Sequence, residues 1–595
     1  MNSPRYHLLL GFVAIFVLGP LGGVTAAYMN FSLGFFVGGQ VLAGILGSAV
    51  TAGYGAEGKH GANYMQTMAA SVAGMSGMAV LIQAMVWLGL PPPPAWQLIL
   101  YFMSIGMFGV GAGMLYTPIL VDKMQLTFPS GLAVANILRA LTDVRLLRRS
   151  IGKLGTGTLI GFVGGQATGR LGALGGLSLS TATIGAGMVV GARITVPAVM
   201  VGLLGEELLP WLREMGWLGA NDPFRKFGFV VALGTILGAA IVDLSIIFRQ
   251  AIGELGKPKA PVAEGEEWKQ TNTTALIGWV VFWGLAVAGI AVGLFGLPPL
   301  FVGIAIGLVF LFLVVNGIST GISDSNPISS AFVVSVFVMA AAGLTDPATG
   351  LMCASILLIA TSVGVDMQQD RSTGWRLGTS RVVQFRYQVI GIVMGAILSI
   401  GFAKLFMTAY PILELNQFAS TDIPAEASAW QSAMTFKFVG ALDGLTHPKS
   451  WTMPALGVGI AIGLVLELIR KVVRAIPAYR DWVVRSRGGY AFDFCFDCFL
   501  VPSPYAASFG GFVDFMTSVW FSVGGVLSSF ATTLEEEAVR PWKERAAASG
   551  VSAPEDDVPE DMSTTGLVGG GLIAGDSLAA LALGLQGLVT AMFRH

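Results

Sequence analysis

The chain has 595 residues, of which 54% are apolar and only 12% are charged. Soluble domains usually carry about 25% charged residues, so this composition and a mean hydropathy of +0.73 exclude an ordinary soluble protein and indicate an all-α integral membrane protein. The net charge of −1 also excludes the strongly basic surface that nucleic-acid binding needs. At about 20 residues per spanning helix, the chain has room for roughly 16 membrane helices.

The first part of the chain is a series of apolar runs, and the run at the N-terminus is long enough to be a membrane helix and not a signal peptide. The expected spans lie near 8–28, 31–53, 62–90 and 95–116, followed by a broken segment at 122–141 and by runs near 154–168, 176–192, 194–210 and 226–248. Residues 1–249 are therefore expected to form a first transmembrane repeat, which ends at a polar linker loop, 250–272.

The second part, residues 273–595, is expected to form a second transmembrane repeat. Its spans are predicted near 273–296, 298–322, 327–344, 349–367, 387–408, 452–475, 489–501, 502–530 and 565–592, with a second interrupted segment at 368–385. Polar insertions lie near 409–450 and 531–563, although Trp430 to Leu445 is apolar enough to dip into the membrane.

The segment 122–141 is the most informative stretch because an apolar run breaks there at Pro129-Ser130-Gly131. Proline removes a backbone donor, and free polar backbone groups at membrane depth are tolerated only inside protein or beside a water-filled cavity. Broken helices of this kind hold substrate and ions in secondary transporters. A kinked or re-entrant span with a structural role is the alternative.

A weak internal repeat relates the two parts. The matched stretches, in the same order in each part, are Phe36-Val37-Gly38 with Phe301-Val302-Gly303, Asn63 with Asn326, Val121-Asp122 with Val365-Asp366, and Ser130-Gly131 with Thr373-Gly374. Arginines accompany both broken segments, and basic loops mark the cytoplasmic side. We therefore expect parallel repeats, with both termini cytoplasmic, in a multi-pass protein of the cell (inner) membrane.

Two stretches carry a resemblance to a known family. QLTFPSGLAVANILRAL, 125–141, and VDMQQDRSTGWRLGTSRVVQFRYQVIG, 365–391, resemble conserved stretches of the oligopeptide transporter family, in its bacterial and yellow stripe-like branch. The family's lysine before the Thr-Gly pair is Ser372 here, and its usual proline is Ser380. SDSNPI, 323–328, and VPSPYAASFGGFVDF, 501–515, extend the resemblance, whereas the NPG and KIPPR signatures of the eukaryotic peptide branch are absent.

The resemblance implies about sixteen transmembrane helices in two repeated halves. It also implies proton-driven symport of short peptides or of metal–chelate complexes, with the proton gradient as the driving force and no cofactor. The expected partners are thus a small-molecule or short-peptide substrate and the lipid bilayer, without nucleic acid. The sequence leaves the oligomeric state open.

Proton coupling needs a carboxylate inside the membrane, where charge is costly and ionisable residues are functional candidates. Our candidates for proton coupling are Asp366, Asp324, Asp122 and Asp443, with the first two preferred because they lie at predicted helix breaks. Further intramembrane charges are Asp243, Glu467, Asp514 and Arg193. The alternative for each carboxylate is a position at the membrane–water boundary, as a helix cap or an arginine partner.

Substrate recognition is expected from polar side chains near the breaks. The candidates are Asn63 with Gln66 in one half, Asn326 with Ser329 in the other, and Ser130, Tyr64 and Tyr505. Amide and hydroxyl groups at helical spacing could bind peptide amides or chelate carboxylates. They could equally make hydrogen bonds between helices, and tyrosines near span ends are often interface anchors.

The three cysteines, Cys353, Cys495 and Cys498, give no disulfide framework. The Cys495-x-x-Cys498 pair lacks the second half of a zinc site, so no metal site is predicted. Two other functions remain as alternatives: a channel or facilitator for a small solute, and, more remotely, an intramembrane serine protease built on Gly74-Met75-Ser76-Gly77. We predict a transporter and not an enzyme.

Overall fold

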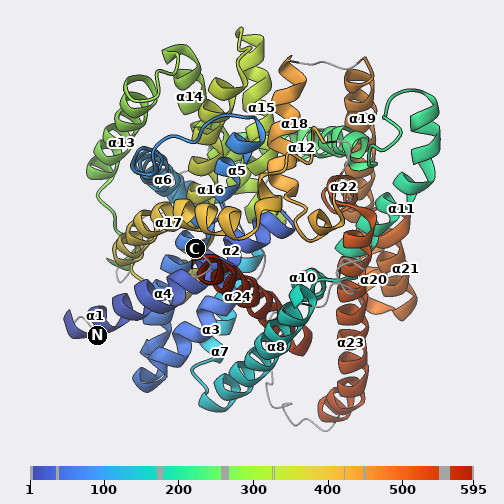
Figure 1. Ribbon diagram of the computed structural model, residues 1–595. Coiled ribbons are helices and arrows are strands. Elements are labelled where there is room, and N and C mark those ends of the chain that lie inside the picture. The colour runs from blue at the N-terminus through green and yellow to red at the C-terminus, as the bar shows by residue number, and fades with distance from the viewer. Residues whose placement is uncertain are drawn as a thin grey trace.

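The computed structural model describes residues 4–34, 39–126, 128–170, 179–255, 267–323, 326, 328–420, 423–446, 450–548 and 563–592. Within these ranges the chain is helical, with no strand (Figure 1). The helices before the polar linker are α1 (Pro4–Val13), α2 (Gly19–Ser32), α3 (Gly39–Thr51), α4 (Gly58–Ser76), α5 (Ala79–Trp87), α6 (Ala95–Thr117), α7 (Pro129–Ala140), α8 (Val144–Arg170), α10 (Thr181–Val190), α11 (Ala192–Glu214) and α12 (Arg225–Leu255).

The helices after the linker include the longest of the protein. They are α13 (Thr273–Gly293), α14 (Pro299–Ser323), α15 (Ile328–Ala341), α16 (Pro347–Leu377), α17 (Arg381–Ala409), α18 (Ala433–Thr446), α19 (Thr452–Ala475), α20 (Pro477–Arg485), α21 (Arg487–Cys495), α22 (Pro504–Phe512), α23 (Phe515–Ala548) and α24 (Thr564–Met592).

The class of fold is the one expected, but the number of long spans is lower. Twelve helical stretches of the described residues are long and apolar enough to cross a bilayer, against roughly 16 expected, and one of these stretches, Ala43–Trp87, runs through several consecutive helices. Two further apolar helical stretches, Thr181–Val190 and Ala331–Ala341, are shorter than a full span. Neither the higher count nor the repeat of two halves follows from these spans.

Helix α16 lies near the middle of the molecule (Figure 1) and is buried along most of its length. It packs against α6, α14, α15, α4 and α7. Small residues allow this close approach: a Cβ atom at Gly109 of α6 would lie 2.5 Å from the carbonyl oxygen of Ala360. Without a hydrophobic force between helices in lipid, such close backbone contact is what holds them together.

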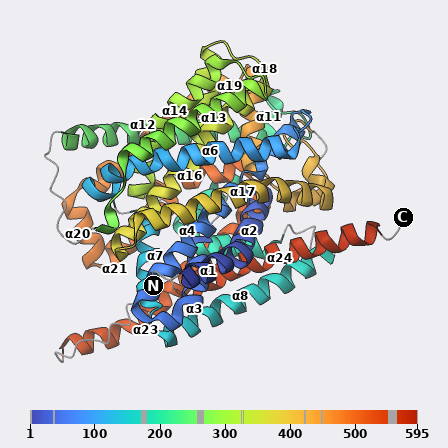
Figure 2. The same ribbon diagram turned by 90° about the vertical axis from the view of Figure 1, so that its left-hand side faces the viewer.

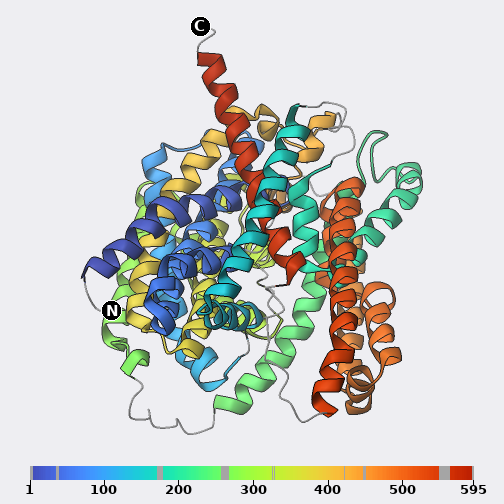
Figure 3. The same ribbon diagram turned by 90° about the horizontal axis from the view of Figure 1, so that it is seen from below.

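The C-terminal helix α24 lies alongside α8, which comes from the first third of the chain (Figure 2). Seen from below, the end of α24 projects from the body, and α23 stands on the opposite side from the N-terminus (Figure 3). The expected polar insertion at 409–450 is partly buried, because Trp430 and Phe436 belong to the core. The insertion at 531–563 begins as a continuation of α23 to Ala548, and residues 549–562 lie outside the described part.

The first predicted break is present. A π-helical turn, η3 (Pro118–Lys123), ends the span, and α7 begins at Pro129. Between them Gln125 and Phe128 have positive φ angles of 47° and 42°, which non-glycine residues rarely adopt. The second break is shorter than predicted: α16 continues to Leu377 and only 378–380 interrupts it, with Gly378 at φ 72°.

Candidate functional site

A polar cluster joins α4, α16 and α17 at the centre of the protein. The amide nitrogen of Gln66 donates a 2.9 Å hydrogen bond to Asp370 Oδ1. Gln384 donates to Thr67 Oγ1 at 3.0 Å and to the backbone oxygen of Asp370 at 2.8 Å. Arg371, with no exposed surface, donates to the Gln384 side-chain oxygen at 2.7 Å. Each polar group is thus held by a partner from a different helix.

This cluster forms because α16 is mostly apolar along its first two-thirds and polar near its end. Its last turns carry Gln368, Asp370 and Arg371, all buried. The helix ends when Gly378 adopts the left-handed conformation, which glycine alone accepts without strain. The chain then turns directly into α17, so the carbonyl of Arg381 accepts a 2.8 Å bond from Arg371.

Both predicted breaks meet at this cluster. Thr373 of α16 donates to the backbone oxygen of Gly131 in α7 at 3.0 Å. Arg381, at the second break, forms an ion pair with Asp122, at the first. A third helix end joins them, because the backbone nitrogen of Phe128 donates to Gly321 near the end of α14 at 2.8 Å. The irregular backbone of the first break is thus held against α14 at Phe128, although Gln125 within it is exposed.

Several buried polar atoms of this region have no hydrogen-bond partner in the described part of the chain. They are both amide atoms of Asn63, Asn316, Gln368 and Gln388, the Gln66 side-chain oxygen, Asp370 Oδ2 and one terminal nitrogen of Arg371. Each such group costs about 1–3 kcal/mol when left unpaired. Donors and acceptors of both charge signs thus converge here, as expected for a site that binds a polar, charged molecule.

Asp366 lies one turn before Asp370 on α16. Unlike its neighbours, it keeps part of its surface accessible, and a Cβ at Gly74 of α4 would lie 3.0 Å from its Oδ2. No cation lies within ion-pair distance of it among the residues that the structure describes. Its placement at a helix break was wrong, because it is inside the continuous part of α16, eleven residues before the end.

Other predicted residues lie close to the cluster. Asn63 and Gln66 belong to it, Ser130 follows the first residue of α7, and Tyr64 stacks on Tyr387 of α17 with 5.4 Å between ring centroids. Asn326 lies just before α15 with its side-chain oxygen buried and unpaired within the described residues. Ser329 lies in the first turn of α15, so the two are not on one helical face as predicted.

Two predicted residues lie elsewhere. The hydroxyl of Tyr505 donates to Asp243 of α12 at 2.9 Å, and Asp443 lies on α18. Asp324 lies outside the described residues. The residues that sequence reasoning missed are Thr67, Asn316, Gln368, Asp370, Arg371, Gln384 and Gln388. The available signal was the polar run 368–373 at the end of an apolar span, which was interpreted as an interruption and not as a buried helix.

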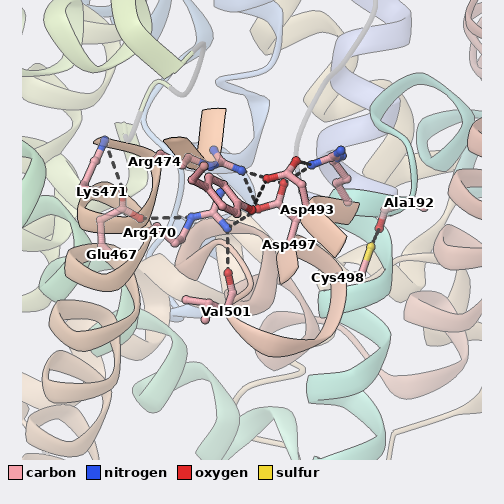
Figure 4. Close-up of polar contacts among 11 residues, drawn as sticks. Ala192, Glu467, Arg470, Lys471, Arg474, Asp493, Asp497, Cys498 and Val501 are labelled. Carbon is pink, nitrogen blue, oxygen red and sulfur yellow. Dashed lines mark hydrogen bonds and ion pairs between the residues drawn. The ribbon is translucent and has the colours of Figure 1, made fainter. Parts of the chain in front are cut away.

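A second charged cluster lies between α11, α19, α21 and the π-helical turn η7 (Phe496–Leu500) (Figure 4). Asp497 accepts from Arg470 at 2.9 Å and from Arg474 at 2.6 Å, and Arg193 pairs with both Asp493 and Asp497. Asp243 and Glu467 are neutralised by Lys471 at 2.8 Å and 3.2 Å. Three of the predicted intramembrane charges, Arg193, Asp243 and Glu467, are thus paired structurally.

Asp493 lies on α21, outside the described stretches that are long and apolar enough to cross a bilayer, so the span expected at 489–501 is not among them. Burial favours its neutral form, but hydrogen bonds from Arg193 and Tyr479 outweigh burial and hold the pKa of Asp493 below its ordinary value. The adjacent Cys498 is buried, with its Sγ 3.8 Å from the Ala192 oxygen, whereas Cys495 is exposed. The described residues contain no group of three or more His, Cys, Asp or Glu side chains suited to a metal ion.

Comparison with known proteins agrees with this arrangement. Residues 8–168 and 270–585 match the model of the family described as OPT oligopeptide transporter protein. The chain is also 23% identical over 506 residues to the "Probable metal-nicotianamine transporter YSL13" of Oryza sativa subsp. japonica. That alignment covers 73% of this chain and 67% of the rice protein. The matched residues include every helix of the central cluster, and the chain belongs to the oligopeptide transporter family of membrane transporters, which are not enzymes.

Proposed function

We propose that the protein is a proton-coupled symporter for a small zwitterionic solute, either a short peptide or a metal chelate. The observation that carries the proposal is the presence of two side chains of opposite charge at the centre. Asp370 Oδ2 and one Arg371 nitrogen are both buried and without a hydrogen-bond partner among the described residues. A solute with an ammonium group and a carboxylate could pair with both: its ammonium would donate to Asp370 Oδ2, and its carboxylate would accept from the Arg371 nitrogen. The unpaired amides of Asn63 and Gln388 supply further donors and acceptors around it.

Metal would be recognised through its chelate in this proposal. The central cluster offers amides, one guanidinium and carboxylates, and lacks the thiolate and imidazole ligands that bind transition metals most tightly. A chelate presents the carboxylates and amines of its organic part, for which the cluster is suited. The relative in rice carries metal and nicotianamine in its name, which supports this class of solute.

Coupling is assigned to Asp366 and Asp370. They are four residues apart on α16 and therefore lie on the same face, one turn apart. Two neighbouring carboxylates resist simultaneous ionisation, so one can take up a proton as the solute binds and release it on the other side. Asp122 is proposed to act differently, as the partner that holds Arg381.

The proposed membrane arrangement keeps about sixteen crossings, some made of broken helices, in two parallel halves. Both termini face the cytoplasm of the cell (inner) membrane in this arrangement. Carrier behaviour is favoured over a channel because Arg371 and Gln384 have no exposed surface, so no open pore passes these two side chains.

The test is uptake into proteoliposomes that contain the purified protein and an imposed proton gradient. We expect trialanine or nickel–nicotianamine to accumulate above its external concentration, and accumulation to stop when a protonophore collapses the gradient. Downhill flux that ignores the proton gradient would instead indicate a facilitator.

A further inference from the structure

Lys437 is a cation that the central cluster does not use. It lies on α18 between Phe436 and Phe438, both without exposed surface, yet its own side chain keeps part of its surface accessible. Its Nζ lies 3.6 Å from the centroid of the Phe512 ring on α22. No carboxylate lies within ion-pair distance of it in the part of the chain that the structure describes. A lysine in such surroundings is costly without a compensating anion.

A second cation, Arg225 at the start of α12, lies on the same part of α18. It is 5% exposed, and its guanidinium carbon lies 4.8 Å from the centroid of the Phe436 ring. Its hydrogen bonds go to neutral groups: the side-chain oxygens of Gln431 at 3.1 Å and of Gln417 at 2.6 Å. Among the described residues Arg225 therefore has no carboxylate within ion-pair distance.

One carboxylate faces this group. Asp514 lies at the break between α22 and α23, and its backbone nitrogen donates to the Gln431 side-chain oxygen at 3.1 Å. Its Oδ1 is buried and unpaired among the described residues. The neighbouring Lys226 forms an ion pair with Asp222 at 2.8 Å, so neither of them is counted with this group. Asp443 lies on α18 as well, but six residues, or about 9 Å, further along the helix than Lys437. Arg225 and Asp514 thus share the Gln431 side-chain oxygen as a partner, whereas Lys437 has no compensating carboxylate among the described residues, which leaves one positive charge in excess.

The backbone around Gln431 is irregular, as it is at the central cluster. Gln431 donates to the Ser32 oxygen at the end of α2 at 2.8 Å, and Ser432 has a φ of 47° before α18 begins. Phe438 of α18 stacks on Phe332 of α15 with 4.1 Å between centroids. Helix α18 packs against the first turns of α16, where Leu442 lies next to Gly350, about 30 Å along the helix from Asp370, so this group is separate from the central cluster.

We propose that Lys437, Arg225, Asp514, Gln431 and Phe512, the Lys437 subsite, bind a carboxylate of the transported solute, with Lys437 Nζ as the cation that contacts it. Phe512 covers one side of the ammonium and leaves its remaining hydrogens for the carboxylate oxygens. This inference rests on the proposed function and narrows it, because a solute that is bound here on its way to or from the central cluster must carry a carboxylate.

The first experiment is reductive methylation of the full-length protein in lipid nanodiscs, read by mass spectrometry. We expect Lys437 to be methylated as the exposed Lys404 is, and trialanine or nickel–nicotianamine to protect Lys437 alone. Trialanine amide, which lacks the carboxylate, should not protect. An unreactive Lys437, no protection by either carboxylate probe, equal protection by the amide, or protection by inorganic phosphate alone would each overturn the proposal.

The second experiment compares Lys437→Met and Lys437→Arg by equilibrium binding and melting temperature. We expect Lys437→Met to weaken trialanine binding by about tenfold or more, to leave binding of the amide unchanged, and to keep or raise the melting temperature. Lys437→Arg should retain most of the affinity, and Lys404→Met serves as the control. Equal loss of acid and amide binding with a lower melting temperature would show a structural role only and overturn the proposal.

These readouts do not depend on coupling. Proteoliposomes that fail to accumulate solute would reject the symport, whereas methylation and equilibrium binding would still decide whether a carboxylate occupies the Lys437 subsite.

Discussion

Asp122 and Arg381 form an ion pair that joins the two broken segments, with 259 residues of chain between them. One Arg381 nitrogen lies 2.8 Å from Asp122 Oδ2, and the arginine is almost fully buried. Since α7 follows one break and α17 the other, the pair fixes how both are placed around α16. It therefore supports the central cluster without belonging to it.

Replacement of Asp122 by Asn should destabilise the protein, because Arg381 would remain buried with its charge uncompensated. We expect a loss of about 1–3 kcal/mol, measured as a lower melting temperature in detergent. Combining Asp122→Asn with Arg381→Gln should restore part of the loss, since the double variant removes both charges. Equal melting temperatures of wild type and Asp122→Asn would show that the pair contributes nothing.

Replacement of Asp366 by Asn should separate binding from coupling. The amide keeps the shape of the side chain but cannot exchange a proton, so uphill accumulation should stop while exchange of solute at equilibrium continues. The measurement compares proton-driven uptake with counterflow in proteoliposomes. Asp346→Asn is the matched control, because Asp346 is an exposed helix cap at the other end of α16. Undiminished uphill uptake by Asp366→Asn would remove Asp366 from the coupling role.

The sequence predicted the first break and its location, because proline and glycine act locally on the backbone. It also led to Asn63 and Gln66, whose spacing on a helix is visible without a structure. The partner of Gln66 was not predictable in this way, since Asp370 comes from a helix 304 residues away. Only the packing of α4 against α16 brings the two side chains together.

The second break was misplaced for a related reason. A polar run at 368–373 is typical of a loop, but here hydrogen bonds with α4, α7 and α17 hold Asp370, Arg371 and Thr373, and the helix continues. Tertiary contacts thus override the local preference. The same limitation hid the role of Arg193, whose charge is paired by Asp493, 300 residues away in the sequence.

Asp493 should make stability depend on pH. Its pKa in the folded protein lies below the ordinary value of 3.8 because Arg193 and Tyr479 stabilise the charged form against burial. The stabilisation is therefore complete above about pH 4 and is lost as the pH falls through the lower, folded-state pKa. We expect melting temperatures of wild type and Asp493→Asn to differ at pH 6 to 7, measured in a buffer series, and to converge towards about pH 3. A difference that stays constant across the series would contradict this assignment.

Gly131 should be intolerant of a side chain, although alanine favours helices. A Cβ at this position would lie 2.8 Å from the Gln369 carbonyl oxygen and 3.3 Å from Thr373 Oγ1, so Gly131→Ala must push α7 away from α16. Such overpacking typically costs about 1–3 kcal/mol, and we expect a lower melting temperature together with reduced solute binding. Gly152→Ala is the control: nothing lies within 4 Å of its added Cβ on α8, so the gain of about 1 kcal/mol in helix propensity should raise the melting temperature and leave binding intact. If both variants melted higher and bound solute normally, close contact between α7 and α16 would not be required for the site.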